Sequence, residues 1–294
     1  MDKIKVQNKV KANNYKVRDR IRHIFQTVWF VITNSYLEGY KSGKIYGGDL
    51  KKICVPGMNC YSCPGARGSC PIGSLQAVIG NSKFKFSYYI VGFLFFIGAL
   101  FGRFVCGWLC PFGLFQDLLY KIPFVKKIKT FKFDKHLRKL KYLILLVFVI
   151  ILPLFVVDVL GQGSPFFCKL ICPVGMLEGG IPLVLLNKSM RSAIGFLYKW
   201  KAFILGLTIF ASIIIYRPFC KYICPLGAIY SVFNPISVFK YKLDKDKCIK
   251  CGKCKKVCQM NIDPVQNCNH LECIRCARCK NACPVKAINY KIKN

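Results

Sequence analysis

The 294-residue sequence is poor in acidic residues and in histidine, with 12 Asp and Glu against 46 Lys and Arg, and only three His. His23, His136 and His270 form no facing pair in an apolar helix, which argues against a bis-histidine haem. The sequence contains no Cys-x-x-Cys-His run for covalent haem, and no Gly-x-Gly-x-x-Gly or P-loop run for nucleotides. With so few acids, general acid–base catalysis has little support.

The rest of the composition combines strong positive charge with strong hydrophobicity. The formal net charge is +34, 54% of residues are apolar and 19 are cysteine. An aromatic content of 14% and long apolar runs exclude a disordered chain, and the length excludes a small secreted disulfide domain. The basic residues carry no nucleic-acid-reading motif, so we expect no nucleic-acid partner and assign the charge to anionic membrane lipid.

Four apolar stretches approach the length of about 20 residues that a helix needs to cross a hydrocarbon core of about 30 Å. They are residues 21–37, 88–109, 140–160 and 200–216. Helices buried in a soluble core are the alternative, which fits poorly for the second and third stretches because they are so uniformly apolar. The sequence therefore predicts a membrane α-helical bundle of about four transmembrane helices.

Basic segments indicate the orientation of this bundle. Residues 1–20 and the loop at 111–139 are rich in Lys and Arg, and such segments favour the cytoplasmic face. We expect a basic cytoplasmic N-terminus at 1–20, a transmembrane domain at 21–240 with an outer Cys-rich loop at 54–70, and a cytoplasmic tail at 241–294. No small-residue cleavage site follows the first apolar run, so we expect no cleavable signal peptide. The predicted location is the cell (cytoplasmic) membrane, as a multi-pass protein.

The tail predicts an α+β, bacterial-type ferredoxin domain with two [4Fe–4S] clusters. Two Cys-x2-Cys-x2-Cys-x3-Cys runs follow one another, and in two-cluster ferredoxins the fourth cysteine of each run serves the other cluster. The predicted ligand sets are Cys248, Cys251, Cys254 and Cys283 for one cluster, and Cys273, Cys276, Cys279 and Cys258 for the other. Zinc or disulfides are the alternatives. Cys268, between the runs, is expected to be a spare buried thiol.

Three further cysteine pairs share the form Cys-x3-Cys-Pro and lie at the edges of the predicted bundle. Residues i and i+4 share one helix face, so we expect each pair to present two thiols side by side before the proline ends the helix. Arg103 and Arg217 precede two of these pairs, and their side chains are expected to snorkel to water or to stabilise cluster charge. The first and third pairs fall on the cytoplasmic side, where one [4Fe–4S] cluster is predicted on Cys106, Cys110, Cys220 and Cys224.

The middle pair, Cys168 and Cys172, falls on the outer side together with the loop at 54–70. In that loop Cys63 and Cys70 each precede a proline, as cluster ligands often do. The hypothesis is an outer redox site in which these two cysteines join the middle pair as metal ligands. Disulfides within the loop are the alternative, because an exported segment permits them.

The run at 102–113, GRFVCGWLCPFG, followed by Gln116 and Asp117, resembles the membrane ferredoxins of the NapH/NosR type. The run at 217–228 and the two-cluster tail resemble the same family, so that the resemblance covers most of residues 88–294. It implies a four- to six-helix membrane protein that passes electrons between the quinone pool or cytoplasmic carriers and a partner reductase. The extra pair at 168–172 and the 54–70 cysteines depart from the family pattern, so a simple nitrate-reductase role does not follow.

These features predict a membrane-bound iron–sulfur protein that relays electrons between cytoplasmic carriers, the membrane or quinone pool and a partner redox enzyme. We expect an electron-transfer component of an oxidoreductase system rather than a stand-alone enzyme. Two alternatives remain open. One is a transmembrane thiol–disulfide conduit that supplies reductant through the outer cysteines. The other is a metal-reducing or assembly factor for another oxidoreductase.

Overall fold

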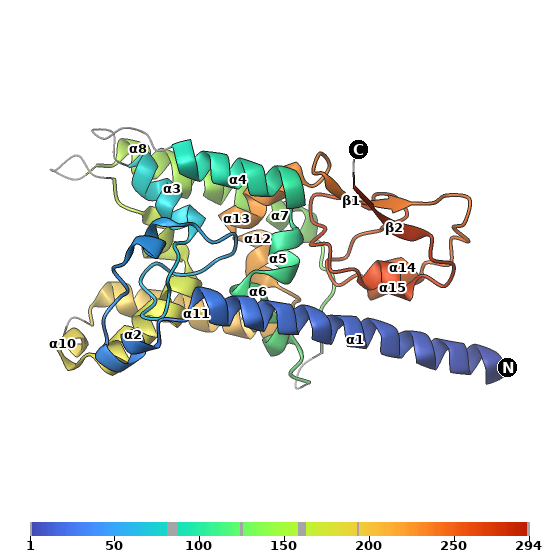
Figure 1. Cartoon of the computed structure of the whole chain (residues 1–294), viewed down its shortest axis with the longest axis horizontal. Helices are drawn as coiled ribbons and strands as arrows, with labels where there is room; N and C mark the ends of the chain where they lie inside the picture. The colour runs from blue at the N-terminus through green and yellow to red at the C-terminus, as the bar shows by residue number, and fades with distance from the viewer. Residues whose placement is uncertain (1, 81–87, 124–125, 158–162, 193, 293–294) are drawn as a thin grey trace.

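The computed structural model describes residues 2–80, 88–123, 126–157, 163–192 and 194–292, and it is mostly helical (Figure 1). The helices form an elongated bundle, and the cysteine-rich tail with its two strands packs against one end of that bundle. The two expected parts of the fold, a helical body and a small α+β ferredoxin domain, are therefore both present.

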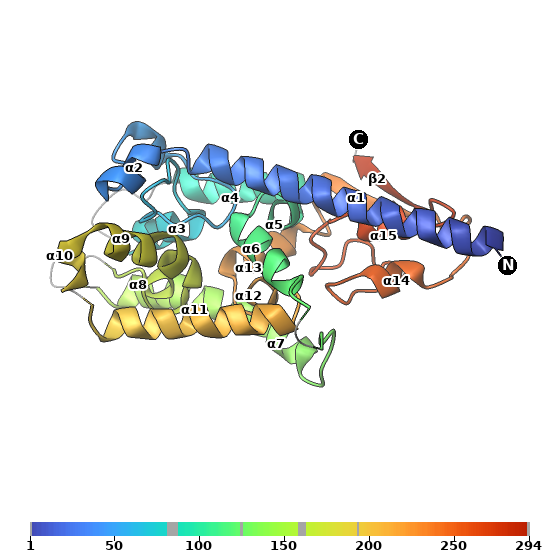
Figure 2. The same cartoon turned by 90° about the horizontal axis from the view of Figure 1, so that it is seen from below.

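Four long segments make up the bundle. They are α1 (Asp2–Thr33), α4 (Tyr88–Phe101), the continuous run of α7 (Asp134–Ile144), η2 (Leu145–Ile151) and α8 (Leu152–Phe155), and α11 (Phe196–Ile214). Figures 1 and 2 show α1, α4 and α11 running along the long axis of the molecule. The N-terminus and the tail lie at one end of this axis, and α2 and α10 lie at the other.

Shorter elements connect the long segments. Before the middle of the chain these are α2 (Leu37–Ser42), η1 (Asp49–Lys52), α3 (Pro71–Ile79), α5 (Phe104–Trp108) and α6 (Pro111–Tyr120). After α8 they are η3 (Phe167–Ile171), η4 (Gly175–Gly180), α9 (Ile181–Leu186), α10 (Lys188–Arg191), α12 (Pro218–Tyr222) and α13 (Pro225–Phe233). Most of the motif cysteines of the bundle lie on or beside these short elements.

Among the described helices, α11 combines the length and the apolar composition needed to cross a membrane. The helix α4 and the run Gly175–Leu186 are apolar but shorter. The predicted stretch at 140–160 extends to residues 158–160, which lie outside the described residues. The described part of the chain thus contains one helix that is both long and apolar enough to cross a membrane, where the sequence predicted about four.

The predicted stretch at 88–109 is divided at Gly102. The helix α4 ends at Phe101 and α5 begins at Phe104, because Gly102 has φ +50°, in the left-handed region that favours glycine. A Cβ at this position would also stand 2.6 Å from the side-chain oxygen of Asn234. The first cysteine pair therefore lies beyond a turn and not on the end of the long helix.

The Cys-x3-Cys-Pro pairs do not share one helix face, contrary to the expectation from their spacing. Cys106 belongs to α5, whereas Cys110 is the N-cap of α6. In the third pair Cys220 belongs to α12 and Cys224 is the N-cap of α13. The proline that follows the second cysteine is the first residue of the next helix, where its missing N–H costs no hydrogen bond. Each of these pairs therefore spans a junction between two short helices.

The tail contains β1 (Phe239–Leu243), α14 (Lys253–Val257), α15 (Arg278–Ala282) and β2 (Ile288–Ile292). The two strands pair antiparallel and place Tyr241 opposite Tyr290, whose rings stack at 5.1 Å. Left-handed residues occupy equivalent places in the two cysteine runs, Lys250 and Gly252 in the first and Arg275 and Ala277 in the second. The repeated cysteine spacing thus corresponds to a repeated backbone turn.

Candidate iron–sulfur sites

The eight cysteines of the two tail runs gather around two small cavities. One cavity is lined by Cys248, Cys251, Cys254 and Cys283, and the other by Cys258, Cys273, Cys276 and Cys279. Each cavity receives three thiols from one run and the fourth from the other run. The third cysteine of each run lies on α14 or α15, and these helices pack against each other.

The residues around both cavities fit an iron–sulfur cluster. No Asp, Glu or His is among the described residues that line them, so thiols are the available donors. Thiolates are the usual ligands of [4Fe–4S] clusters, each bound to a separate iron. Along the described chain, no three His, Cys, Asp or Glu side chains stand close enough together to hold one metal ion. The donor set, four thiols from two runs around each cavity, is the one that a [4Fe–4S] cluster uses.

Cys268 lies between the two tail cavities. It lines the cavity of the second run and interacts electrostatically with Cys248 and Cys254 of the first run. Burial raises the pKa of Cys268 to about 11, and its thiol donates a hydrogen bond to the Pro264 carbonyl oxygen at 2.8 Å. A protonated, hydrogen-bonded thiol agrees with the expected spare cysteine.

Four buried thiols come together where α5, α6, α12 and α13 meet. They interact electrostatically with one another, and the most exposed of them is 7% exposed. We call this group the inner cysteine site, and its members are Cys106, Cys110, Cys220 and Cys224. The donors are again thiols, so this group also fits a [4Fe–4S] cluster.

Two arginines hold the backbone of the inner cysteine site. The Arg103 guanidinium donates to the Cys220 carbonyl oxygen at 3.0 Å, and the Arg217 guanidinium donates to the Cys106 carbonyl oxygen at 2.6 Å. Each arginine thus precedes one cysteine pair and holds the backbone of the other. Both are fully buried, so the snorkelling expected from the sequence does not occur.

Hydrogen bonds reach the sulfur atoms of the inner cysteine site directly. Gln116 donates from Nε2 to Cys220 Sγ at 3.1 Å, and its Oε1 accepts from the Phe219 amide at 3.2 Å. The Gly227 amide donates to Cys224 Sγ at 3.3 Å. Such bonds favour the more negative state of a cluster and so set its reduction potential.

A buried group of ion pairs connects α1 with the inner cysteine site. Arg22 donates to the Gly107 carbonyl oxygen at 3.1 Å and pairs with Asp117 at 2.8 Å, and Arg217 binds the same carboxylate with two bonds of 2.6 Å. Burial opposes ionisation of Asp117, but Arg217 and Arg22 outweigh it and hold its pKa well below the usual value. The first helix therefore fixes the backbone beside Cys106.

The second cysteine run of the tail docks onto the inner cysteine site. The carbonyl oxygen of Ile274, next to Cys273, lies against Gly107, next to Cys106, and a Cβ on Gly107 would stand 2.2 Å from it. The Trp108 indole donates to the Arg275 carbonyl oxygen at 3.1 Å. One tail cavity and the inner cysteine site are therefore joined by a direct backbone contact.

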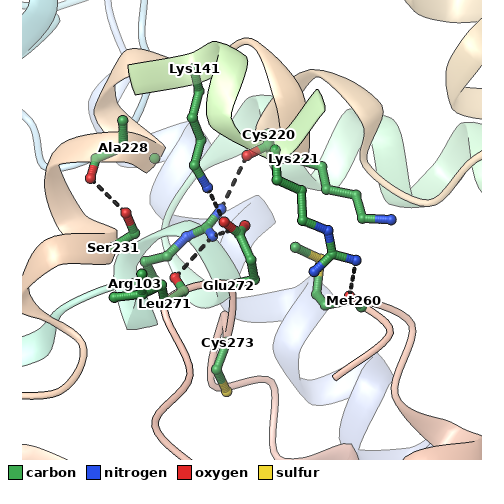
Figure 3. A network of polar contacts seen from close by, with 12 residues as sticks. Arg103, Lys141, Cys220, Lys221, Ala228, Ser231, Met260, Leu271, Glu272 and Cys273 are labelled. Atoms are coloured by element: carbon green, nitrogen blue, oxygen red, sulfur yellow. Dashed lines mark hydrogen bonds and ion pairs between the residues drawn. The ribbon is translucent and has the colours of Figure 1, made fainter. Parts of the chain in front are cut away.

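A buried ion-pair network supports this docking (Figure 3). Glu272 of the tail accepts from Arg103 at 2.5 Å and also from Lys141 of α7. Burial opposes ionisation of Glu272, but Arg103 and Lys141 outweigh it and lower its pKa to about 2. Asn234 adds three bonds from its Nδ2 to carbonyl oxygens of the tail, the shortest of 2.8 Å to Cys273.

A second group of thiols lies in the half of the bundle away from the tail. They line a cavity of about 540 Å³, and the members of this outer cysteine site are Cys60, Cys70, Cys168 and Cys172. The structure thus brings Cys70, Cys168 and Cys172 together as expected, but the fourth thiol is that of Cys60 and not of Cys63. The Cys63 thiol instead meets Tyr40 Oη at 3.3 Å and Asn34 Oδ1 at 3.5 Å.

The inference from sequence gave no role to several residues that hold these sites: Gln76 and Glu272 were not singled out, and Gln116 was named only as part of the family resemblance. A signal for the glutamines is present in the sequence, because Cys-Pro-x-Gly-x-x-Gln occurs at 70–76 and again at 110–116. No comparable local pattern marks Glu272 or Arg22, since their partners lie far away along the chain.

Comparison with protein families matches the chain to 4Fe-4S binding domains. One such model matches residues 86–132 and 201–244, which carry the inner cysteine site, and a second matches residues 241–262 in the first tail run. The chain therefore contains [4Fe–4S] binding domains at several positions, including the C-terminal ferredoxin domain. No solved structure matches the chain.

Curated relatives support the same assignment. The chain is 30% identical over 178 residues to the uncharacterized protein MJ0749 of Methanocaldococcus jannaschii, covering 58% of this chain and 57% of that one. It is 30% identical over 174 residues to the putative electron transport protein YccM of Escherichia coli, covering 56% and 44%. It is 28% identical over 182 residues to the regulatory protein NosR of Stutzerimonas stutzeri, covering 59% and 22%. The match thus spans less than two thirds of each relative, and it confirms the resemblance to NapH/NosR-type membrane ferredoxins.

Proposed function

We propose that this protein, similar to membrane ferredoxin-type electron-transport proteins, relays single electrons between the two tail clusters and a third [4Fe–4S] cluster on the inner cysteine site. The proposed ligands are the eight cysteines of the two tail runs and the four of the inner cysteine site. A bound [4Fe–4S] cluster supplies one-electron transfer without bond making or breaking. No side chain of the chain is assigned a catalytic role.

The contact between Ile274 and Gly107 is the main support for this relay. Gly107 directly follows Cys106 of the inner cysteine site, and Ile274 directly follows Cys273 of the second tail run. Cys268 in turn lies between the two tail cavities. The cavity of the first tail run, the cavity of the second tail run and the inner cysteine site therefore follow one another from the tail into the bundle.

The protein's own groups would set the relay's potentials and hold its geometry. Gln116 and the Gly227 amide stabilise negative charge on the inner sulfurs, while the nearby guanidinium groups of Arg103 and Arg217 add positive charge. Burial of all four thiols excludes water, which otherwise weakens these electrostatic effects.

A multi-span membrane bundle is the arrangement that best explains the outer surface of the helices. Large apolar side chains on all four long segments are more than half exposed, among them Ile24, Phe95, Leu143 and Phe203. Exposed apolar surface of this extent marks a contact with lipid or protein. Together with the length of α11, it supports four spans and the domain limits of 1–20, 21–240 and 241–294.

The arrangement of the ends supports a cytoplasmic tail. The N-terminus and the tail lie at the same end of the bundle in Figures 1 and 2. The N-terminal residues 1–20 and the basic loop at 111–139 then face the cytoplasm, in agreement with the preference of Lys and Arg for that side. The segment at 54–70 faces the opposite side in this topology.

A quinone and a redox enzyme are the proposed partners. An apolar cavity of about 280 Å³ lies between α1, α6 and η4–α9, and its lining includes Pro111 beside Cys110 and the side chains of Phe30 and Phe115. An apolar pocket with few polar groups suits a hydrophobic ring compound. Its place next to the inner cysteine site supports exchange of electrons with a quinone there.

The relay is tested on the full-length protein, purified in detergent without oxygen. Cys220→Ala is expected to lower the iron and acid-labile sulfide content by about four atoms each per chain relative to wild type. The electron paramagnetic resonance signal of one cluster should disappear in a redox titration. Cys268→Ala is the matched control, and its iron content should equal that of wild type. Unchanged iron in Cys220→Ala would remove the third cluster from the relay.

A thiol–disulfide conduit is the rival function, and the same preparation separates the two. In a conduit, reducing the protein would increase the number of thiols that an alkylating reagent labels. In the proposed relay, labelling of the proposed ligand cysteines stays low in both states because iron protects them.

A further inference from the structure

We propose that the outer cysteine site binds an additional [4Fe–4S] cluster, with Cys60, Cys70, Cys168 and Cys172 as its four ligands. This cluster lies outside the residues matched by the 4Fe-4S domain models. The inference goes beyond the proposed relay, because neither the tail nor the inner cysteine site supplies any of these ligands.

The outer cysteine site repeats the construction of the inner one. Gln76 donates from Nε2 to Cys168 Sγ at 3.3 Å, and its Oε1 accepts from the Phe167 amide at 3.0 Å. In the inner cysteine site, Gln116 makes the equivalent bonds to Cys220 Sγ and the Phe219 amide. In both sites the glutamine follows a Cys-Pro-x-Gly run and reaches the cysteine of a Phe-Cys pair from another helix. The same local design therefore appears twice in one chain.

Glycine brings the backbone close to the sulfur atoms on both sides of the cavity. Cys70 is the N-cap of α3, and the amides of Gly73 and Gly175 interact with the Cys70 and Cys172 thiols respectively. A Cβ on Gly73 would stand 3.8 Å from Cys168 Sγ, and a Cβ on Gly175 would stand 3.7 Å from Cys60 Sγ. Side chains at these positions would enter the space between the four thiols.

Asn59 provides an independent sign of a bound group. It lines the cavity, is 1% exposed, and neither polar atom of its side chain has a hydrogen-bond partner among the described residues. A buried amide without partners costs stability unless a ligand or water satisfies it. A cluster held by the four thiols, together with water in the cavity, would supply the missing partners.

A cation balances the charge of the proposed cluster. The Nζ of Lys201 lines the same cavity, interacts electrostatically with the thiols of Cys60 and Cys168, and would stand 3.2 Å from a Cβ on Gly175. Four thiolates and a cluster carry net negative charge, which a nearby ammonium group stabilises. The carboxylate of Glu178 accepts from the Cys60 amide at 2.7 Å and also interacts electrostatically with the Cys60 thiol, so Lys201 offsets its charge as well.

Two consecutive residues connect the outer cysteine site with the inner one. The Met58 amide interacts with the Cys110 thiol, and the Asn59 amide interacts with the Cys70 thiol. The sites are thus separated by little more than one peptide unit at this point. When one electron moves between the two clusters, the donor cluster is oxidised by one electron and the acceptor cluster is reduced by one electron. No proton is transferred, and no bond forms or breaks.

Iron analysis of the full-length protein, purified in detergent without oxygen, tests this site. Cys60→Ala and Cys168→Ala should each lose about four iron and four sulfide atoms per chain. Cys54→Ala and Cys63→Ala are matched controls from the same outer loop, and their iron content should equal that of wild type. Size-exclusion profiles and the resonance signals of the remaining clusters verify that the variants are folded.

The outcomes separate this site from the relay. Loss of iron in Cys168→Ala but not in Cys220→Ala supports the outer cluster and overturns the inner one. Unchanged iron in both Cys60→Ala and Cys168→Ala overturns the outer cluster and leaves the relay standing. Equal loss of iron in the Cys63→Ala control would overturn the ligand set proposed here.

Discussion

The carbonyl oxygen of Ile274 lies so close to Gly107 that a Cβ on residue 107 would stand 2.2 Å from it. The two residues belong to the tail and to the bundle, and each directly follows a cysteine of its own site. Glycine at 107 is therefore required by the approach of the two backbones and not by its own dihedral angles. Proximity of the two sites depends on the absence of one methyl group.

Replacing that glycine by alanine should weaken the docking of the tail. The clash of Gly107→Ala with a backbone atom is expected to cost about 1–3 kcal/mol, as other overpacked substitutions do. Limited proteolysis between bundle and tail should become faster, while the iron content stays at the wild-type value. Gly206→Ala is the control, because no atom lies within 4 Å of a Cβ there. Equal proteolysis of the two variants would contradict the close approach.

Removing the glutamine bond to sulfur should change a cluster potential. Gln116→Leu deletes the N–H that faces Cys220 Sγ, so the reduced state of the inner cluster loses stabilisation and its potential becomes more negative. A shift of tens of millivolts is expected, since about 1.4 kcal/mol corresponds to about 59 mV for one electron. Redox titration followed by electron paramagnetic resonance measures it. Gln76→Leu should leave this potential unchanged and shift that of the outer cluster, and a reversed pattern would refute the assignment.

Loss of the Glu272 charge should destabilise the assembled protein. Glu272→Gln leaves Arg103 and Lys141 buried with one anionic partner fewer, and breaking a buried pair of this kind costs about 3–5 kcal/mol. A lower thermal unfolding midpoint in detergent is the expected result. Asp49→Asn removes the exposed pair with Lys52 and should change the midpoint little, because surface pairs contribute about 0–1 kcal/mol. Similar decreases of the unfolding midpoint in both variants would show that the buried ion-pair network stabilises the protein no more than the exposed pair does.

The proposed topology predicts on which side of the membrane a reporter protein is placed when it is fused after the tail or inserted at Gly47. Green fluorescent protein fused after the tail should fluoresce, because it folds in the cytoplasm. Alkaline phosphatase inserted at Gly47 should be active, because that position has open space around it and lies between the first and second predicted spans, which this topology places outside. If alkaline phosphatase were active when fused after the tail, or green fluorescent protein fluoresced at Gly47, the proposed four-span topology would be contradicted.

The ligand sets of the tail could be predicted from the sequence because they depend on the spacing of cysteines within short runs. Ligand spacing within each run fixes a loop that wraps a cluster, and the grouping of Cys258 and Cys283 with the opposite runs follows from the same repeat. The inner grouping could also be inferred, since identical motifs end at the same side of the predicted bundle. In both cases the pattern and the geometry arise from a short stretch of backbone.

Features that depend on distant partners were harder to infer. Cys63 was expected at the outer site because a proline follows it, but Tyr40 and Asn34 occupy its thiol, and Cys60 lies at the cavity instead. Arg103 was expected to reach water, but a carboxylate from the tail and a carbonyl from α12 hold it inside. Such contacts are made between segments whose relative position no single motif encodes.

The inner cysteine site takes two thiols from the first half of the chain and two from the second, and each tail cavity takes a thiol from the run that serves the other. The inner cysteine site is complete only when Cys224 has left the ribosome, and the two tail cavities only when Cys279 and Cys283 have followed. Loading with iron and sulfide is therefore a late step of biosynthesis. At that step the thiols must still be reduced and accessible to the cell's cluster donors.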